Sequence, residues 1–230
     1  MVDPARPPRR SRVERSADSR QLILDATLDC LLEKGYAHTT TLVIQARAGI
    51  SRGRLLHHFP SREGLLVAAC QHLANSHLAD LKAWVSRSLP DIGPDSERMH
   101  RAIDLLWAAY AERYFWGSVE LWTAARTDAR LRETLLPEER RLGNAIRRVV
   151  DALFGPRLTR HPSYPRLREL LLTSMRGVAL TYAFDQHRDR SRDAHLPIWR
   201  ALAEQMLAEE PDDRYSDNHA DYHPAGLRTD

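Results

Sequence analysis

The sequence contains very little of several residue types that define common classes of protein. It has only two cysteines, Cys30 and Cys70, which lie far apart in 230 residues, both in apolar helical surroundings. This excludes a disulfide-rich scaffold and a cysteine-based metal site, and it predicts two reduced core thiols. No apolar run approaches the roughly 20 residues that a bilayer-spanning helix needs. The basic N-terminus also lacks the apolar segment of a secretory signal. The sequence therefore predicts a cytoplasmic protein with no membrane partner.

Strand patterns and enzyme motifs are missing as well. No stretch alternates apolar and polar residues for long enough to predict a strand. The chain has no G-x-S-x-G, no phosphate-binding glycine-rich loop and no H-E-x-x-H. Its histidines do not share helix faces, since His57 and His58 are adjacent and His72 and His77 are five residues apart. We therefore expect no catalytic residue, no metal site and no cofactor.

Lysine is scarce, because only Lys34 and Lys82 are lysines among the 34 basic residues and the rest are arginines. Arginine favours bidentate contacts with phosphate and guanine. A codon bias towards arginine in a GC-rich genome explains the excess equally well. The net charge of +3 is in itself a weak sign of nucleic-acid binding.

What the sequence does contain is apolar residues at helical spacing almost throughout, which predicts an all-α fold of about nine helices. We expect a disordered basic arm (1–19), a helix-turn-helix head (20–66), a helical body (67–210) and a disordered acidic tail (211–230). The first helix should run over residues 20–34 and stop at Gly35. The later helices are expected over residues 61–88, 96–114, 116–126, 128–154, 166–187 and 196–209. The helix over 128–154 should be kinked or interrupted at Pro137, and residues 155–165 should form a loop.

Residues 40–59 have the layout of a helix-turn-helix. A short helix capped by one of Thr39, Thr40 and Thr41 should end at Ala48, and Gly49 permits the left-handed backbone of a tight turn. Ser51 should cap a second short helix whose exposed face carries arginines and histidines. Such a helix fits the major groove, where arginine reads guanine edges.

The same region resembles the head of the tetracycline-repressor (TetR) family. The resemblance lies in Gly35-Tyr36-Ala37-His38-Thr39-Thr40-Thr41, in Ala48-Gly49-Ile50-Ser51-Arg52-Gly53, and in His57-His58-Phe59-Pro60-Ser61-Arg62-Glu63. It implies an all-α homodimer with a three-helix DNA-binding head, a variable ligand-binding body and a dimer interface on the last two long helices. The chain departs from the family with Leu56 in place of a tyrosine that contacts the DNA backbone, and with Arg62 in place of a lysine.

These motifs and the resemblance together give the expected DNA-binding residues. They are Thr40, Thr41, Arg47, Ser51, Arg52, Gly53, Arg54, His57, His58 and Arg62.

The body is rich in large aromatics at helical spacing, which could line a pocket for an apolar or aromatic effector. The competing interpretation is that they fill the core between helices. Trp107, Tyr110 and Tyr114 follow i, i+3, i+7 spacing and should share one helix face, with Glu120 as a polar group nearby. The expected ligand-binding residues are Trp84, Trp107, Tyr110, Tyr114, Trp116, Glu120, Trp122 and Tyr182.

Each of the last two helices carries an apolar stripe with small residues that would permit close helix approach. Packing on the chain's own body is one interpretation, and the family resemblance favours a dimer interface. The expected interface residues are Leu170, Ser174, Gly177, Val178, Trp199, Leu202 and Met206.

The sequence thus predicts a regulator that binds double-stranded DNA at a palindromic operator as a homodimer, most simply a repressor released by an unknown small-molecule effector. Two alternatives remain at this point. One is a helical small-molecule-binding protein or enzyme with a vestigial head. The other is an architectural protein that binds DNA without sequence preference.

Overall fold

The computed structural model describes residues 12–88, 94–184 and 190–208, and over these residues the chain forms nine α-helices and no strand. The head contains α1 (Arg12–His38), α2 (Thr41–Ala48) and α3 (Arg52–His58). The body contains α4 (Arg62–Ser88), α5 (Asp95–Ala109), α6 (Arg113–Ala125), α7 (Ala129–Leu158), α8 (Tyr164–Thr181) and α9 (His195–Ala208). The predicted all-α class is confirmed.

The head is held together by the local signals that the sequence predicts. Gly35 has φ 71° and ψ 173°, so the regular part of α1 stops there and one more turn continues to His38. The Thr40 side chain accepts from the Val43 amide at the start of α2, and Gly49 ends α2 with φ 62°. Ser51 then caps α3 by accepting from the Arg54 amide. Caps and a left-handed glycine therefore fix the tight turn between α2 and α3.

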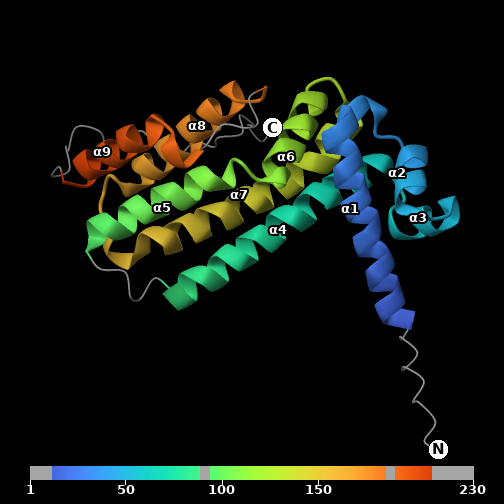
Figure 1. The fold of residues 1–230 in the computed structure, drawn as a ribbon, viewed down its shortest axis with the longest axis horizontal. Coiled ribbons are helices and arrows are strands. Elements are labelled where there is room, and N and C mark those ends of the chain that lie inside the picture. Colours follow the sequence, from blue (N-terminus) through green and yellow to red (C-terminus); the bar gives the residue numbers. More distant parts are fainter. Residues whose placement is uncertain (1–11, 89–93, 185–189, 209–230) are drawn as a thin grey trace, which may run out of the picture.

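The expected arm is shorter than predicted, because α1 begins at Arg12 and not at Arg20. Residues 12–19 contain no glycine or proline and include arginine, glutamate and alanine, which favour helix. Figure 1 shows this end of α1 projecting beyond the rest of the head. Residues 1–11 of the arm, and the whole predicted tail, lie outside the described residues.

Several helix boundaries in the body also differ from the prediction. A turn over Tyr110–Glu112 separates α5 from α6, so the expected helix over 96–114 is wrong at its end. The helix α7 runs through Pro137 without interruption and breaks instead at Gly155, where φ is 82°. One further turn continues to Leu158 within the expected loop. The helix α8 ends at Thr181, six residues earlier than predicted.

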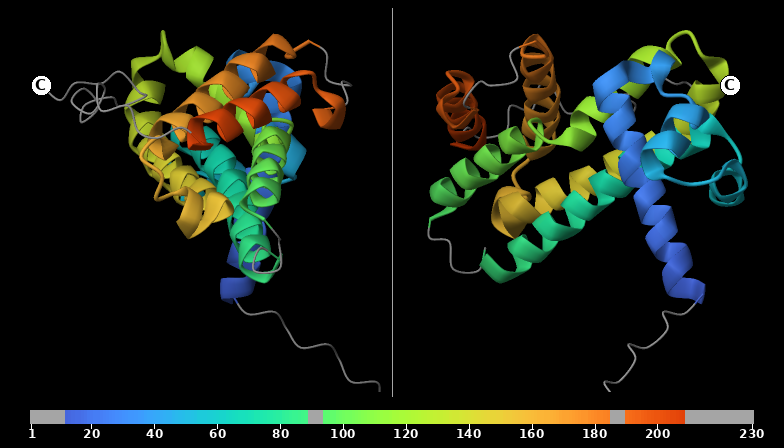
Figure 2. Two further views of the ribbon diagram at one scale, coloured as in Figure 1. Left: turned by 90° about the vertical axis from the view of Figure 1, so that its left-hand side faces the viewer. Right: turned by 45° about the vertical axis from the view of Figure 1, so that its right-hand side comes forward.

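The helices of the body pack in layers. The long helices α4 and α7 lie against each other and extend away from the head, and α5 packs on α7 (Figure 1). The helices α8 and α9 lie side by side on the far side of α5, away from α2 and α3 (Figure 2).

Two buried clusters form the core. One fills the head and the near ends of α4, α6 and α7, and the other fills the body between α5, α7, α8 and α9. The ring of Trp122 packs against both clusters. The helix α4 is also continuous from Arg62 to Ser88. The packing is therefore not interrupted at residue 66, where the boundary between head and body was expected.

Candidate functional site

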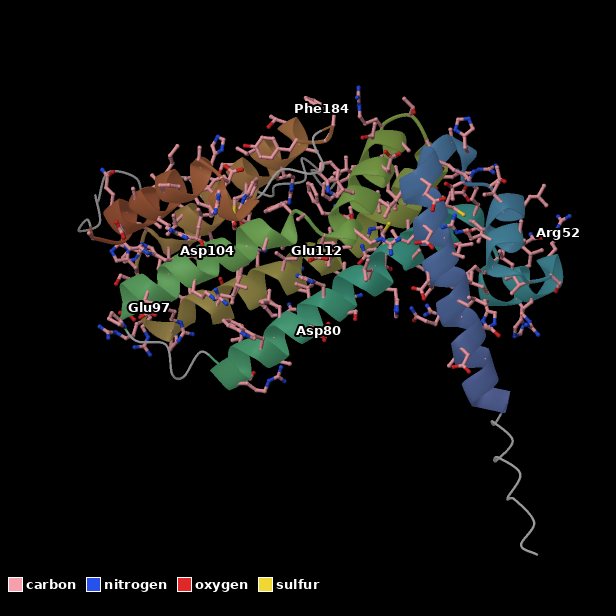
Figure 3. All side chains as sticks on the ribbon, in the orientation of Figure 1. Arg52, Asp80, Glu97, Asp104, Glu112 and Phe184 are labelled. Carbon is pink, nitrogen blue, oxygen red and sulfur yellow. The ribbon has the colours of Figure 1, made fainter. Side chains whose placement is uncertain are left out.

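The exposed face of α3 is cationic. Arg52, Arg54 and His57 are exposed, whereas Leu55 on the opposite face is fully buried in the head core. Gly53 lies between the two arginines, and a Cβ added there would meet nothing within 4 Å. Figure 3 shows Arg52 at the outer end of the head, pointing away from the body. The face is thus free for a large anionic partner.

A further arginine, which the sequence did not point to, joins this face from α1. The Arg20 guanidinium carbon lies 5.4 Å from the centre of the Phe59 ring. Burial lowers the pKa of His58, and the neighbouring positive charges of His57, Arg20 and Arg54 lower it further. We call Arg20, Arg52, Arg54, His57 and His58 the α3 cationic patch. The positive charges of this patch repel one another, and a row of DNA phosphates would relieve that repulsion.

Two of the expected DNA-binding residues have partners inside the head. Arg47 on α2 forms ion pairs with Glu33 at 2.5 Å and with Asp29 at 3.4 Å, both on α1. Arg62 donates through Nε to the Thr39 carbonyl at 2.8 Å and through Nη2 to the Tyr36 carbonyl. The guanidinium carbon of Arg62 also lies 4.1 Å from the centre of the Tyr36 ring. In this structure both arginines therefore hold α1, α2 and α4 together.

Tyr36 also fastens the head to the body. Its hydroxyl donates to Asp128 Oδ2 at 2.6 Å, and its amide donates to Glu120 Oε2 at 3.3 Å. Asp128 in turn caps α7 by accepting from the Leu131 amide at 3.0 Å. The Glu120 carboxylate, expected as a polar group of a ligand pocket, contacts the head in this structure. The reason is that the side chain of Glu120 faces α1, while the neighbouring Trp122 faces the body interior.

This contact leads to a prediction for stability against pH. The hydrogen bond from Tyr36 is the main cause that lowers the pKa of Asp128 below its ordinary value of 3.8. A carboxyl whose pKa is depressed on folding adds stability above its ordinary pKa, and this stability is lost as pH falls through the folded value. We expect Tyr36→Phe to melt at a lower temperature than the parent at pH 7, with the difference narrowing as the pH falls below 3.8. Thermal melts of both proteins over this pH range measure the difference in melting temperature. A difference that stays constant with pH would contradict a hydrogen bond from Tyr36 to the ionised Asp128.

Three of the seven expected ligand-binding aromatics are core residues. Trp107 packs against Trp199 with ring centres 4.8 Å apart and against Tyr110 and Tyr182 at 6.2 Å. All four are buried. Tyr114 does not share a helix face with Trp107, because the turn at Tyr110 places it on α6. The competing interpretation from the sequence, a packed aromatic core, therefore holds for Trp107, Tyr110 and Tyr182. The remaining aromatics, Trp84, Tyr114, Trp116 and Trp122, are partly buried against the same core.

A polar group that the sequence did not indicate crosses the body near Trp122. The indole nitrogen of Trp122 donates to Glu139 Oε2 at 2.9 Å, and Gln71 Nε2 donates to Glu139 Oε1 at 3.2 Å. On the other side, the Arg176 guanidinium carbon lies 5.3 Å from the centre of the Trp122 ring. These residues come from α4, α6, α7 and α8, so no spacing within one helix could reveal them.

The expected dimer residues separate into two groups. Trp199 is only 4% exposed, and its indole nitrogen donates to Ser174 Oγ at 3.0 Å, so these two residues pack inside the chain. Val178 and Met206 are partly buried against the core, and Leu202 is partly buried too. In contrast, Leu170 is 41% exposed and Gly177 faces open space. Three apolar residues that the prediction missed, Leu180, Phe184 and Ile198, are exposed on or just after these helices, with Phe184 at 90% (Figure 3).

Both cysteines are buried free thiols, and burial raises the pKa of Cys70 to about 12. Within the described ranges, no three histidine, cysteine or acidic side chains are grouped as a metal site would require. No helix in those ranges is both long and apolar enough to span a membrane.

A small helix-turn-helix head with a cationic recognition helix, carried on a larger helical body, defines an all-α regulator that binds DNA. Comparison with known proteins agrees with this class of DNA-binding regulator. A family model described as "Bacterial regulatory proteins, tetR family" matches residues 23–69. The HTH-type transcriptional regulator CymR of Pseudomonas putida is 27% identical over 187 residues, which cover 80% of this chain and 89% of that protein. The head thus matches the model of the TetR family, and most of the chain is similar to a helix-turn-helix transcriptional regulator.

Solved structures share the fold. FadR of Bacillus subtilis, in complex with stearoyl-CoA, has a TM-score of 0.58 at 14% identity and covers 81% of this chain and 97% of its own. The multidrug-binding protein EbrR, complexed with imidazole, has a TM-score of 0.55 at 21% identity and covers 85% of this chain and 97% of its own.

Proposed function

We propose that the chain acts in the cytoplasm as a homodimeric repressor, which binds a palindromic operator and leaves it when a small molecule binds in the body. The observation that carries this proposal is the exposed cationic face of α3, fixed by the Ser51 cap and by burial of Leu55. A short helix presenting arginines in this way fits the major groove of B-DNA. An enzyme or carrier with a vestigial head would have no need for arginine and histidine all facing outward.

The proposed contacts divide into base-reading and positioning groups. Arg52, Arg54 and His57 on α3 would read base edges, and Gly53 would let the backbone come close. Thr40, Thr41 and Ser51 lie at the N-terminal ends of α2 and α3, where backbone amides favour phosphate. Arg20 would add positive charge near the DNA backbone, and the His58 imidazole would add a hydrogen-bonding group. We leave Arg47 and Arg62 out of this set because the structure gives them partners within the head.

The arm offers a prediction about salt dependence. Arg6, Arg9 and Arg10 precede α1, and each arginine that neutralises a phosphate should contribute about 0.9 to the slope of log affinity against log salt. Deleting residues 1–11 should therefore flatten the slope by up to about 3. A control with Arg140→Gln and Arg148→Gln on the body surface should keep the parent slope. If the deletion leaves the slope unchanged, the arm does not contact DNA.

Dimerisation is part of the proposal because one short helix reads too few base pairs, whereas two heads on a two-fold axis read a palindrome. The exposed stripe of α8 contains Leu170, Gly177 and Leu180 and continues to Phe184. These residues follow helical spacing along one face. A second copy of the chain would bury this face against its own.

Gly177 gives a clean test of this interface. A Cβ at this position meets nothing within 4 Å in the single chain, so Gly177→Leu should leave the fold intact. Two helices that approach closely at Gly177 would be pushed apart, and overpacking costs about 1–3 kcal/mol. We expect the dimer dissociation constant to rise about tenfold or more in sedimentation experiments. Ala108→Leu on the exposed face of α5 is the matched control. An unchanged dimer in the Gly177→Leu protein would place the interface elsewhere.

The effector part of the proposal draws on the likeness in fold to two proteins solved with small molecules, namely FadR with stearoyl-CoA and EbrR with imidazole. In this chain α6 links the two regions, since Trp122 faces the body interior and Glu120 contacts the head at Tyr36. A ligand that favours one position of α6 would shift the population of head positions away from the one that fits two half-sites.

Sequence-specific binding is tested by comparing the operator with a scrambled duplex of the same composition. A specific regulator should bind its operator about a thousandfold or more tightly than the scrambled duplex in fluorescence anisotropy at fixed salt. Equal affinities would instead indicate an architectural protein that binds DNA without reading sequence.

A further inference from the structure

The large apolar side chains that stay exposed are confined to two parts of the molecule. Within the described residues, α4, α5, α6 and α7 expose none of them. Four lie on or just after α8 or on α9, where the proposal places the dimer interface. The other three lie in the head, namely Leu22 on α1, Leu42 on α2 and Leu56 on α3. Because single exposed leucines are common on protein surfaces, the informative feature is their position and not their exposure.

Leu56 is the one of these three that lies on the helix proposed to enter the major groove. The preceding residue, Leu55, is fully buried in the head core, whereas Leu56 is 42% exposed. Residues four apart in a helix are neighbours on its surface, so Leu56 lies on the same side of α3 as the exposed Arg52. A leucine side chain has no polar group with which to bind a phosphate or the polar edge of a base. Any group of the DNA that packs on Leu56 must therefore be apolar.

The surface of α3 beside Leu56 is open down to the backbone. Side chains in a helix lean towards its N-terminus, so Leu56 lies over the preceding turn, which contains Arg52 and Gly53. Gly53 has no side chain, and a Cβ added there would meet nothing within 4 Å. A small group can therefore approach Leu56 over Gly53 without meeting a side chain at that position.

The base pairs present one apolar group in the major groove, which is the C5 methyl group of thymine. Four residues of helix span about 6 Å, the rise of roughly two base pairs. We propose that Leu56 packs on the methyl group of an operator thymine within about two base pairs of the guanine read by Arg52. Leu56 is then a specificity-determining residue, and Gly53 provides the space that the methyl group needs. This inference rests on the proposed function, because it assigns one base of the operator.

The test replaces thymine by deoxyuridine in the operator that the full-length protein selects from a random pool. Deoxyuridine keeps the base pair and the O4 acceptor of thymine and lacks only the methyl group. Burial of one such group is worth about 0.8 kcal/mol, or about fourfold in affinity, so replacing the symmetric pair of thymines should weaken binding roughly 15-fold. Fluorescence anisotropy at fixed salt, with each symmetric pair replaced in turn, measures the loss. If no replacement weakens binding, the proposal is wrong.

Variants connect the methyl group to this side chain. Because Leu56 is exposed and alanine favours helix, Leu56→Ala should fold, and it should bind the operator and its deoxyuridine form about equally. Leu56→Met keeps a long apolar side chain and should keep part of the preference for thymine. The matched control is Leu22→Ala, which removes a leucine of similar exposure, 49%, outside the helix-turn-helix and should keep the full preference. If Leu56→Ala keeps the parent's preference for thymine, another residue contacts the methyl group and the proposal is wrong.

This inference and the proposed function fail in different ways. A selected palindrome whose thymines can all be replaced without loss would leave the regulator intact and contradict only the role of Leu56. A selection that recovers no shared sequence would contradict both, because the protein would then read no thymine at a fixed position.

Discussion

Replacing Trp107 by alanine is expected to destabilise the protein by about 3–5 kcal/mol, the usual effect of truncating a buried aromatic residue. Trp107 is 1% exposed and contacts the rings of Tyr110, Tyr182 and Trp199, which belong to three different segments of the body. For a chain of this length the loss corresponds to a fall in melting temperature of roughly 6–20 °C. Thermal melts followed by circular dichroism measure it.

The control is Trp116→Ala, which makes the same change at a partly buried position beside Phe115. It should lower the melting temperature clearly less, because less surface returns to water. A Trp107→Ala protein that melts like its parent would contradict the packed core and restore the interpretation of Trp107 as part of an open pocket.

The second large effect is expected on DNA binding. Arg54 is exposed on α3, and its backbone amide is held by Ser51, so truncating its side chain should leave the head folded. Arg54→Ala should weaken binding to the operator by about 1–3 kcal/mol, which is the value of one good arginine contact to a base. Base preference at one position of each half-site should relax at the same time.

Arg140→Ala on the exposed surface of α7 is the matched control and should bind the operator like the parent. The comparison with a scrambled duplex gives the informative result. A loss for Arg54→Ala that is equal on operator and scrambled DNA would make Arg54 a phosphate contact and move base reading to Arg52 and His57.

The head could be predicted from the sequence because its structure depends on local signals. The caps at Thr40 and Ser51 and the left-handed Gly49 each act within a few residues. Ser51 and Gly49 are found where the sequence places them, and the cap of α2 is one of the three threonines that the sequence offers. The beginning of α1 differs from the prediction because a basic stretch with little apolar content is typical of a disordered arm, whereas the residues from Arg12 onwards favour helix. The partners of Arg47 and Arg62 could not be predicted, since each reaches residues 14 or more positions away.

The body was harder to predict because its sites form between helices. The turn at Tyr110 contains no glycine or proline, and it depends on packing such as the contact of Tyr110 with Phe115 at 5.0 Å. Glu120 and Trp122 are only two residues apart, yet one contacts the head and the other the body core. Likewise, Gln71, Glu139 and Arg176 come together from three helices. Periodicity identifies which residues are buried but not which of them meet.

Selection of bound duplexes from a random pool by the full-length protein tests the central claim most directly. The account predicts enrichment of a palindrome whose half-sites are about one helical turn apart, because two α3 helices related by a two-fold axis must each enter the major groove. The same selection with Arg54→Ala should relax the sequence at symmetric positions. Recovery of a pool with no shared sequence, or of a single unrepeated half-site, would contradict a dimeric regulator that reads DNA through α3.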